Sequence, residues 1–337
     1  MPQDLSLKAM PISPETLICE ATGAAQAQRR ARIQSLWSGY GEIVRYALQG
    51  SELASVVVKN VIFPTAIDHP RGWHNDVGHQ RKVRSYEVEM AWYRDWSRRC
   101  DQHCRVPRCY ALRTFGERHL MVLEDLDAAG FPRRKERLDR HEALACLSWL
   151  AHFHALFLGE KPTDLWPIGS YWHLATRQAE WRMIKDAALR QAAATLDARL
   201  NACRFQTLIH GDAKVANFCF SQDGRRVAAV DFQYVGGGCG MKDVAYFLGS
   251  CLDEREQRER EGDLLDGYFA ALRRALKVRG KDFDSSALEA EWRAIFPLAQ
   301  ADFYRFLVGW CPEHWKVHDY SRKVALTVVA GLLKEEG

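Results

Sequence analysis

The chain contains 337 residues, of which 47% are hydrophobic and 27% are charged, and its formal net charge is +4. This length is long for one hydrophobic core and natural for two lobes. The mild charge, without a basic run that contains aromatic residues, argues against a nucleic-acid partner. The N-terminus lacks a basic and then apolar signal, and the apolar stretches near Ala143–Leu158 and Val324–Leu333 are too short or interrupted to cross a bilayer. We therefore expect a soluble cytoplasmic protein with no membrane partner.

The N-terminal region contains three prolines and then an alanine-rich amphipathic stretch, which predicts a strand followed by a short helix. The segment Ser38-Gly39-Tyr40-Gly41-Glu42 precedes the apolar stretch Ile43–Leu48. Its two glycines would let backbone amides approach a phosphate in a loop between strands. A Gly-x-Gly pattern alone also describes a structural turn, so both interpretations of Gly39 and Gly41 stay open.

The run Ser55–Val61 is rich in β-branched residues and is broken by a single charge, Lys59, which predicts a strand. A lysine inside a buried strand is costly unless its charge is paired, whereas an edge strand would let it reach water. The helix predicted over Tyr86–Tyr93 carries two candidate partners, Glu87 and Glu89. The sequence thus predicts a buried ion pair, with an edge-strand lysine as the alternative.

The segment Phe63–Lys82 is rich in proline and glycine, which predicts a loop between that strand and that helix. Its histidines, His69, His74 and His79, do not fall on one helical face, which disfavours a metal site. A plain surface loop and a basic lid over a bound ligand remain as interpretations.

Ten cysteines are present, and most stand singly among apolar neighbours, as reduced buried thiols do. Only Cys100, Cys104 and Cys109, with His103 between them, form a cluster. Their spacing differs from the paired Cys-x-x-Cys pattern of zinc sites, so a structural zinc is the less favoured alternative.

The segment Leu120–Leu126 predicts an apolar strand that ends in acids, and Leu144–Leu158 repeats its apolar residues at three and four, which predicts a helix. His152 and His154 on that helix are interpreted as core or capping residues. Further helices are predicted toward the C-terminus, over Leu264–Val278, Ser286–Ile295, Ala299–Val308 and a final segment, with a solvated charged face at Glu254–Glu261.

Strands in the first third and helices in the rest predict an α+β protein with two lobes. The boundary is expected at residue 124, with an N-terminal lobe over residues 1–124 and a C-terminal lobe over residues 125–337.

A hairpin is predicted in the second half of the chain. Phe218–Ser221 and Val227–Val230 read as short apolar strands, and Asp223-Gly224 between them is a strong turn signal. If these two residues form the turn, Asn217 lies opposite Val230 and therefore beside Asp231. Both polar side chains then meet at the open end of the hairpin.

Three side chains around this hairpin supply what phosphoryl transfer requires. A carboxylate must orient the attacking hydroxyl, and hard oxygen ligands must hold Mg²⁺ against the phosphates. Asp212 precedes Asn217 by five residues, the spacing of the protein-kinase catalytic loop, and Asp231 follows on the next strand. An ordinary hairpin preceded by a helix cap is the alternative for the same residues.

The segment from His210 to Phe218, together with Val230-Asp231-Phe232-Gln233, resembles the aminoglycoside phosphotransferase and choline kinase superfamily, particularly its ecdysteroid-kinase-like branch. The resemblance extends from about residue 36 to about residue 252. It implies a two-lobed protein-kinase-like fold, with a small β-rich N-lobe that binds the nucleotide and a larger helical C-lobe that carries catalysis and binds the acceptor. It also implies transfer of a phosphoryl group from ATP or GTP, with Mg²⁺, to a hydroxylated small molecule.

The resemblance also implies roles for single residues in the second half of the chain. Asp212 would be the catalytic base, and Asn217 and Asp231 would be the magnesium ligands. Asp243 matches an aspartate that steadies the catalytic loop, in which His210 takes part.

In the first half, Lys59 would contact the α- and β-phosphates and pair with Glu89, which is favoured over Glu87 because Tyr93 follows it as in the family's Glu-x-x-x-Tyr. Backbone groups near Glu124, Asp125 and Leu126 would hydrogen-bond the adenine edge. Gly39 and Gly41 would form the phosphate loop.

The acceptor is less constrained by the sequence. Aromatic faces in the C-lobe would suit either a quaternary ammonium or a flat apolar alcohol, and most of its tryptophans are explained by packing. These tryptophans are Trp149, Trp166, Trp172, Trp181, Trp292, Trp310 and Trp315. A small hydroxylated metabolite ranks above an aminoglycoside because acidic clusters are lacking there.

Two further classes of function stay open. One is a catalytically idle relative that binds nucleotide, and the other is a protein kinase. The absence of Ala-Pro-Glu after Asp231 counts against the protein kinase. The intact set Lys59, Asp212, Asn217 and Asp231 counts against the idle relative.

Overall fold

The computed structural model describes residues 13–36, 39–63 and 76–336. The chain forms two compact units. The first consists of residues 1–78 and 107–129, and the second of residues 79–106 and 130–337. The assignment of separate lobes to residues 1–124 and 125–337 stays a prediction.

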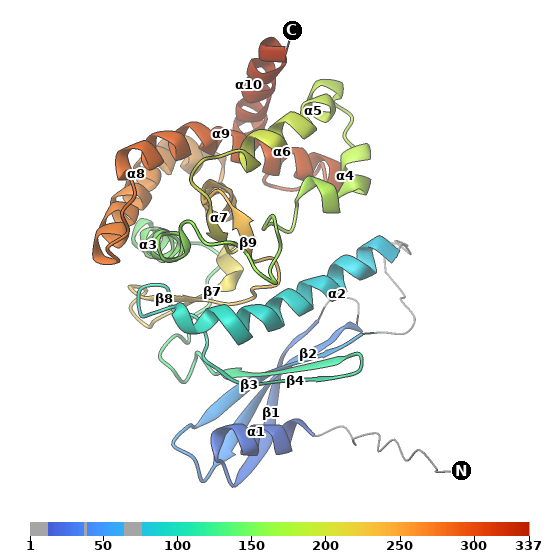
Figure 1. The fold of residues 1–337 in the computed structure, drawn as a ribbon, viewed down its shortest axis with the longest axis vertical. Coiled ribbons are helices and arrows are strands. Elements are labelled where there is room, and N and C mark those ends of the chain that lie inside the picture. The colour runs from blue at the N-terminus through green and yellow to red at the C-terminus, as the bar shows by residue number, and fades with distance from the viewer. Residues whose placement is uncertain (1–12, 37–38, 64–75, 337) are drawn as a thin grey trace. The chain divides into compact units, whose positions relative to one another are not determined.

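The first unit is built on a five-stranded antiparallel sheet with the order β1-β2-β3-β5-β4 (Figure 1). Its core contains apolar side chains of the inner strands together with Leu17 and Ile18 of a short helix, α1. The elements are α1 (Pro14–Thr22), β1 (Gln26–Ser35), β2 (Gly41–Gln49), β3 (Ser55–Ile62), β4 (Cys109–Phe115) and β5 (Arg118–Glu124). The strands predicted over Ile43–Leu48, Ser55–Val61 and Leu120–Leu126 are confirmed.

The order of the first two elements is the reverse of the prediction, since a helix precedes a strand. The Ser13 side chain accepts a hydrogen bond from the Thr16 amide at 3.1 Å, and Pro14 occupies the first turn, where its missing N–H costs nothing. Gly23, with φ of 69°, ends the helix. The alanine-rich stretch that follows is extended because it pairs along β2, with Gln26 opposite Gln49.

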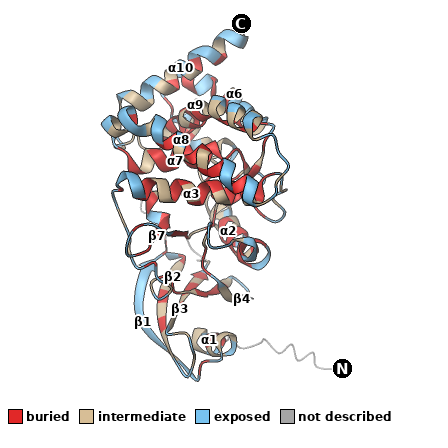
Figure 2. Ribbon diagram, turned by 90° about the vertical axis from the view of Figure 1, so that its left-hand side faces the viewer, coloured by how far each residue is buried: buried red, intermediate tan, exposed pale blue. Residues whose placement is uncertain are grey.

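The second unit is mainly helical, and α7 is buried along most of its length (Figure 2). Most of α2 belongs to it. The longer helices are α2 (Asp76–Ala91), α3 (Arg140–Phe157), α6 (Ala193–Asn201), α7 (Met241–Cys251), α8 (Glu254–Val278), α9 (Ser285–Trp310) and α10 (Asp319–Glu336). Shorter elements are η2 (Trp92–Trp96), η3 (Ser97–Arg99), η4 (Leu174–Thr176), α4 (Gln178–Arg182), α5 (Ala187–Gln191), β6 (Thr207–Ile209), η5 (Val215–Asn217), β7 (Phe218–Phe220), β8 (Val227–Ala229) and β9 (Gly236–Gly238).

Three predicted boundaries differ from the structure. The two helices expected around Pro297 are one helix, α9, in which buried side chains such as Trp292 and Phe296 continue a single packed face past the proline. Burial of that face offsets the one hydrogen bond that proline cannot make. The helix predicted to begin at Leu264 begins at Glu254, because the charged run Glu254–Glu261, predicted as a solvated helix face, is the first part of α8. α2 begins at Asp76, so the last residues of the predicted loop are helical, while residues 64–75, with His69 and His74, lie outside the described residues.

No helix in the described parts of the chain is long and apolar enough to span a bilayer.

Candidate active site

The hairpin of the second unit has the register that the turn signal predicts. β7 and β8 are antiparallel, with Phe218 opposite Ala229 and Phe220 opposite Val227. One step further out, the Val230 amide donates to the Asn217 carbonyl oxygen at 3.0 Å. The predicted position of Asn217 opposite Val230 is therefore confirmed, and Asp231 follows directly.

Asp212 lies in the buried loop that leads into this hairpin and is held from two sides. The side-chain Nδ2 of Asn217 donates to the Asp212 carbonyl oxygen at 2.8 Å and to Oδ2 at 3.1 Å, and Lys214 Nζ donates to Oδ2 at 2.8 Å. Oδ1 is buried and accepts no hydrogen bond of good geometry from the described residues. The Tyr246 hydroxyl interacts with the same carboxylate. A buried carboxylate oxygen without a well-aligned donor is costly, so Oδ1 is available to accept a hydrogen bond from a ligand.

Asp231 has a left-handed backbone, with φ of 68°, which is unfavourable for a residue other than glycine. Its Oδ1 accepts a hydrogen bond from Gln233 Nε2 at 2.7 Å. Gln233 Oε1 accepts in turn from Lys82 Nζ at 2.7 Å and Ser85 Oγ at 3.2 Å, both on α2. The aspartate side chain is therefore oriented through a glutamine that α2 holds.

Asp243, in the first turn of α7, braces the start of the same loop. Its carboxylate accepts hydrogen bonds from the backbone amides of His210 at 2.6 Å and Gly211 at 2.9 Å. His154 Nε2 lies 3.2 Å from the same carboxylate, and His154 Nδ1 lies 2.8 Å from the Tyr268 hydroxyl. His210 Nε2 lies 3.0 Å from the Val230 carbonyl oxygen. The loop before Asp212 and the end of β8 are thus fastened to one buried network.

The glycine in this loop is required by its surroundings. Gly211 has φ of 78°, and a Cβ atom there would lie 2.1 Å from the carbonyl oxygen of Tyr234. No other residue fits without movement of the backbone.

The oxygen donors at this site suit Mg²⁺. Asn217 and Asp231 carry the amide and carboxylate oxygens that this ion prefers, and two such ligands are typical where nucleotide phosphates complete the coordination. The orphaned oxygen of Asp212 lies in the same loop. Within the described residues, no group of three or more His, Cys, Asp and Glu side chains is arranged to hold a metal ion, so the zinc alternative at Cys100, Cys104 and Cys109 gains no support.

In the first unit, Lys59 lies on the central strand β3, opposite Ile43 of β2 and Met121 of β5, and its side chain is buried. The edge-strand alternative for Lys59 is therefore wrong. Glu89 lies on α2 and is also buried. Because α2 is assigned largely to the second unit, the pairing of Lys59 with Glu89 stays a prediction.

The acids at the end of β5 have structural partners inside the first unit. Asp125 Oδ2 lies 2.7 Å from Arg45 Nε and accepts from Ser55 Oγ at 2.7 Å, so its carboxylate connects the end of β5 to the middle of β2 and the start of β3. Glu124 Oε2 accepts from the Arg108 amide at 3.0 Å, and Leu126 is buried. Only the backbone of this segment is left for the predicted adenine contact.

The two glycines of the predicted phosphate loop differ. Gly41 has φ of 119°, and a Cβ atom there would lie 2.0 Å from the Asn60 carbonyl oxygen, which explains this glycine by strand packing alone. Gly39 has φ of 75° and no described atom within 4 Å of an added Cβ, so glycine is favoured there by the backbone conformation alone.

The sequence profile of the ecdysteroid kinase-like family matches residues 75–159 and 170–280, more than half of the chain. The chain belongs to the ecdysteroid kinase-like family. Curated protein sequences gave no match.

Three solved structures similar to this ecdysteroid kinase-like protein carry the names of kinases. A microcompartment-associated aminopropanol kinase is 17% identical over 90% of this chain and 88% of that one, with a TM-score of 0.51. A putative fructosamine-3-kinase from Haemophilus somnus 129PT is 12% identical over 98% and 100%, with a TM-score of 0.48. A choline/ethanolamine kinase family protein from Mesorhizobium loti is 13% identical over 89% and 86%, with a TM-score of 0.42. The likeness to the first establishes the fold alone, and the predicted two-lobed protein-kinase-like fold is confirmed.

Sequence reasoning missed several residues around the site of this family member. His154 was expected in the core, where it lies, but not as a partner of Asp243. Gln233 ends the motif Val230-Asp231-Phe232-Gln233, but no role was predicted for it. Lys316 was not singled out, because nothing near it in the sequence marks it.

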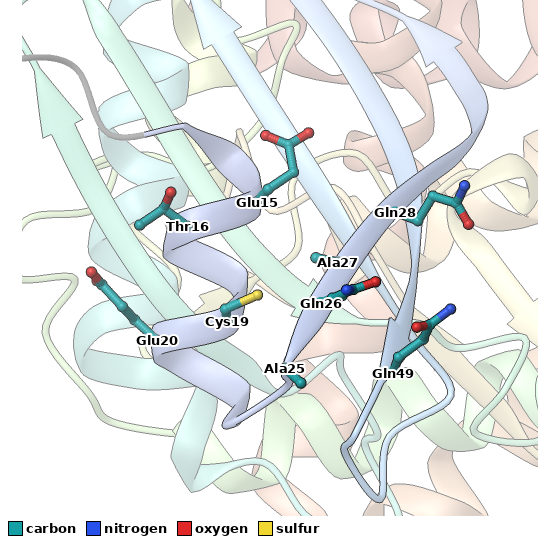
Figure 3. Close-up of a pocket in the computed structure, with 9 residues that line it drawn as sticks. All are labelled: Glu15, Thr16, Cys19, Glu20, Ala25, Gln26, Ala27, Gln28 and Gln49. Carbon is teal, nitrogen blue, oxygen red and sulfur yellow. The ribbon is translucent and has the colours of Figure 1, made fainter.

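A hollow of about 640 Å³ lies in the first unit between α1 and β1 (Figure 3). Its lining includes the polar residues Glu15, Glu20 and Gln49. None of the predicted site residues of this family member lines it.

Proposed function

We propose that this chain is a magnesium-dependent small-molecule kinase that transfers the γ-phosphoryl group of ATP, or GTP, to a hydroxyl of a metabolite. The observation that supports this is the convergence of Asp212, Asn217 and Asp231 at the open end of one hairpin, with Asp212 Oδ1 buried and without a good donor.

In this proposal Asp212 is the catalytic base. The acceptor hydroxyl donates to Oδ1, its oxygen attacks the γ-phosphorus, and the bond to the β,γ-bridging oxygen breaks. The proton moves to the Asp212 carboxylate, and the nucleoside diphosphate leaves. Lys214, bound to Oδ2, partly balances the charge on this carboxylate.

Mg²⁺, when bound, would supply positive charge that balances the charge of the phosphates. Asn217 and Asp231 would hold it, Gln233 would orient Asp231, and the brace at Asp243 would keep His210 and Gly211 in place.

The first unit would bind the nucleotide. Lys59, buried on the central strand, would contact the α- and β-phosphates and pair with Glu89. Backbone groups of Glu124, Asp125 and Leu126 would bind the adenine edge, and Gly39 and Gly41 would face the phosphates. The ten free cysteines support a cytoplasmic, reducing location.

A catalytically idle binder and an aminoglycoside phosphotransferase are the competing functions. Loss of catalysis usually removes one of the essential groups, and this chain retains Lys59, Asp212, Asn217 and Asp231.

The experiment is a screen of hydroxylated metabolites for phosphorylation from γ-labelled ATP and GTP, with Asp212→Asn as the matched inactive control. We expect the label to appear in an acceptor with the parent chain and to be nearly absent from it with the variant. Nucleotide binding without transfer to any acceptor would instead favour the idle binder.

A further inference from the structure

Lys316 lies in the segment between α9 and α10, and its ammonium group sits over aromatic rings. Nζ is 4.8 Å from the ring centre of Tyr246, 5.4 Å from that of Phe303 and 5.5 Å from that of Trp315. The backbone holds this position, because the Lys316 amide donates to His314 Nδ1 at 3.2 Å and the Lys316 carbonyl oxygen accepts from Ser321 Oγ at 3.0 Å. The ring contacts and the backbone hydrogen bonds together fix the position of the ammonium group.

The acceptors available to this ammonium group indicate what it can bind. Among the residues that the structure describes, no carboxylate forms an ion pair with Nζ and no oxygen accepts a hydrogen bond from it. An ammonium group has three donors, and partial burial without acceptors is unfavourable. Burial lowers the pKa of Lys316 to about 8, although the Asp212 carboxylate acts in the opposite direction. A bound anion would satisfy this group.

Lys316 also lies on the path to the proposed catalytic base. The Tyr246 ring beneath it belongs to a residue whose pKa is raised well above its usual value, first by burial and then by the charge of Asp212. Tyr171 lies beside Tyr246, with ring centres 5.6 Å apart, and its amide donates to the Gly211 carbonyl oxygen at 3.1 Å. Two tyrosines, Tyr246 and Tyr171, therefore connect Lys316 to the loop that carries Asp212.

The neighbouring aromatic faces are covered by a second cation of the chain itself. The Arg177 guanidinium lies 5.5 Å from the ring centre of Tyr171 and 5.3 Å from that of Phe306. Faces occupied in this way cannot also cage the ammonium group of a ligand. The charge of Lys316 repels such a group, whereas the charge of Arg177 is paired with Glu180 at 3.1 Å. These contacts disfavour an amino alcohol or a quaternary ammonium acceptor.

We propose that Lys316 binds an anionic group of the acceptor, so that the kinase phosphorylates a hydroxylated acid. This inference rests on the proposed function, because it assigns the acceptor of the same site. The shared chemistry would also suit a terminal phosphate of the nucleotide, and the experiment separates the two sources.

Three probes of similar size differ only in the charge of one end: hydroxypropanoate is anionic, propanediol is neutral and aminopropanol is cationic. Their dissociation constants are measured by saturation-transfer NMR with the full chain, Mg²⁺ and a non-hydrolysable ATP analogue. Lys316→Met keeps the apolar stem over the rings, and Lys316→Arg keeps the charge. Lys185→Met, at an exposed position of the same unit, is the matched control.

The parent chain and Lys185→Met are expected to bind hydroxypropanoate most tightly and aminopropanol least. Lys316→Met should lose roughly tenfold or more in affinity for hydroxypropanoate alone, the usual effect of removing a charged hydrogen bond, and Lys316→Arg should retain most of it. Thermal melting verifies that each variant is folded.

Three results would overturn the inference. The first is a parent chain that shows no preference for the acid, including one that binds none of the probes. The second is the same preference in Lys316→Met, and the third is weaker binding of the ATP analogue in Lys316→Met while binding of the acid is unchanged. The last result would assign the ammonium to the nucleotide. Nucleotide binding is titrated separately, so a chain that prefers the acid but binds no nucleotide would contradict the proposed kinase and leave the anion site standing.

Discussion

Gln233 Nε2 donates a hydrogen bond to Asp231 Oδ1 at 2.7 Å, so one of the proposed magnesium ligands is aimed by its second neighbour in the chain. The other end of the same amide is held by Lys82 and Ser85 on α2. An amide can bridge in this way because it carries donors and an acceptor together. Where protein kinases have glycine, this chain has a residue that connects α2 to the proposed metal site.

Gln233→Leu should weaken magnesium-dependent binding of nucleotide, because it frees the Asp231 carboxylate from its fixed direction. A loss of roughly tenfold is expected, the usual effect of removing a partner that orients a metal ligand. Calorimetric titration of ATP at several magnesium concentrations measures it. Lys82→Met, which removes only one contact with α2, should have a smaller effect, and an unchanged magnesium dependence in Gln233→Leu would contradict the bridging role.

Asp212→Asn should lower turnover by roughly 10² to 10⁴, the range for a lost general base, with little change in nucleotide binding. The amide keeps the shape of the carboxylate but cannot take the proton. Steady-state rates with the acceptor found in the screen, beside a nucleotide titration, measure both quantities. Asp231→Ala is the contrasting variant, since it should weaken nucleotide binding itself; equal turnover of Asp212→Asn and the parent would remove Asp212 from the role of base.

Asp243→Ala should destabilise the fold by about 3 kcal/mol, because it leaves the buried amides of His210 and Gly211 without their acceptor and removes the partner of His154. Urea unfolding gives the change in the free energy of unfolding. The control is Asp263→Ala on the exposed face of α8, which should change it by less than about 0.5 kcal/mol. Equal effects of the two variants would show that the brace contributes nothing.

Affinity for hydroxypropanoate should fall as the pH rises through about 8, the pKa of Lys316, because the ammonium loses its proton there while the carboxylate of the probe stays ionised. The charged or titratable groups that act on Lys316 are Asp212, Lys214 and Cys251, and none of them is replaced in the parent chain or in Lys316→Arg. Binding constants measured from roughly pH 6.5 to 9.5 test this. Lys316→Arg, which stays charged, should abolish the dependence, and a decline that persists in that variant would assign the titration to another group.

Much of the candidate site follows from local sequence. The turn at Asp223-Gly224 and the apolar strands around it determine which residues face each other, because a hairpin's register depends on its turn and on alternation. That is why Asn217 could be placed opposite Val230 in advance. The burial of Lys59 was also predicted, in this case from the β-branched residues on either side of it.

Other features depend on contacts between distant segments. The first helix and strand were predicted in the wrong order because pairing of the alanine-rich segment with β2 overrides its helical composition. The helix around Pro297 continues because both of its halves bury side chains in one core. Local propensity does not contain these energies.

The sequence by itself determined the family, the fold class and the hairpin that carries Asn217 and Asp231, since these depend on short-range spacing and turn chemistry. Only the tertiary structure decided that α2 orients Asp231 through Gln233, that His154 supports Asp243, and that the ammonium of Lys316 approaches the Asp212 site. Each of these relationships joins residues far apart along the chain, and their positions depend on how whole elements pack.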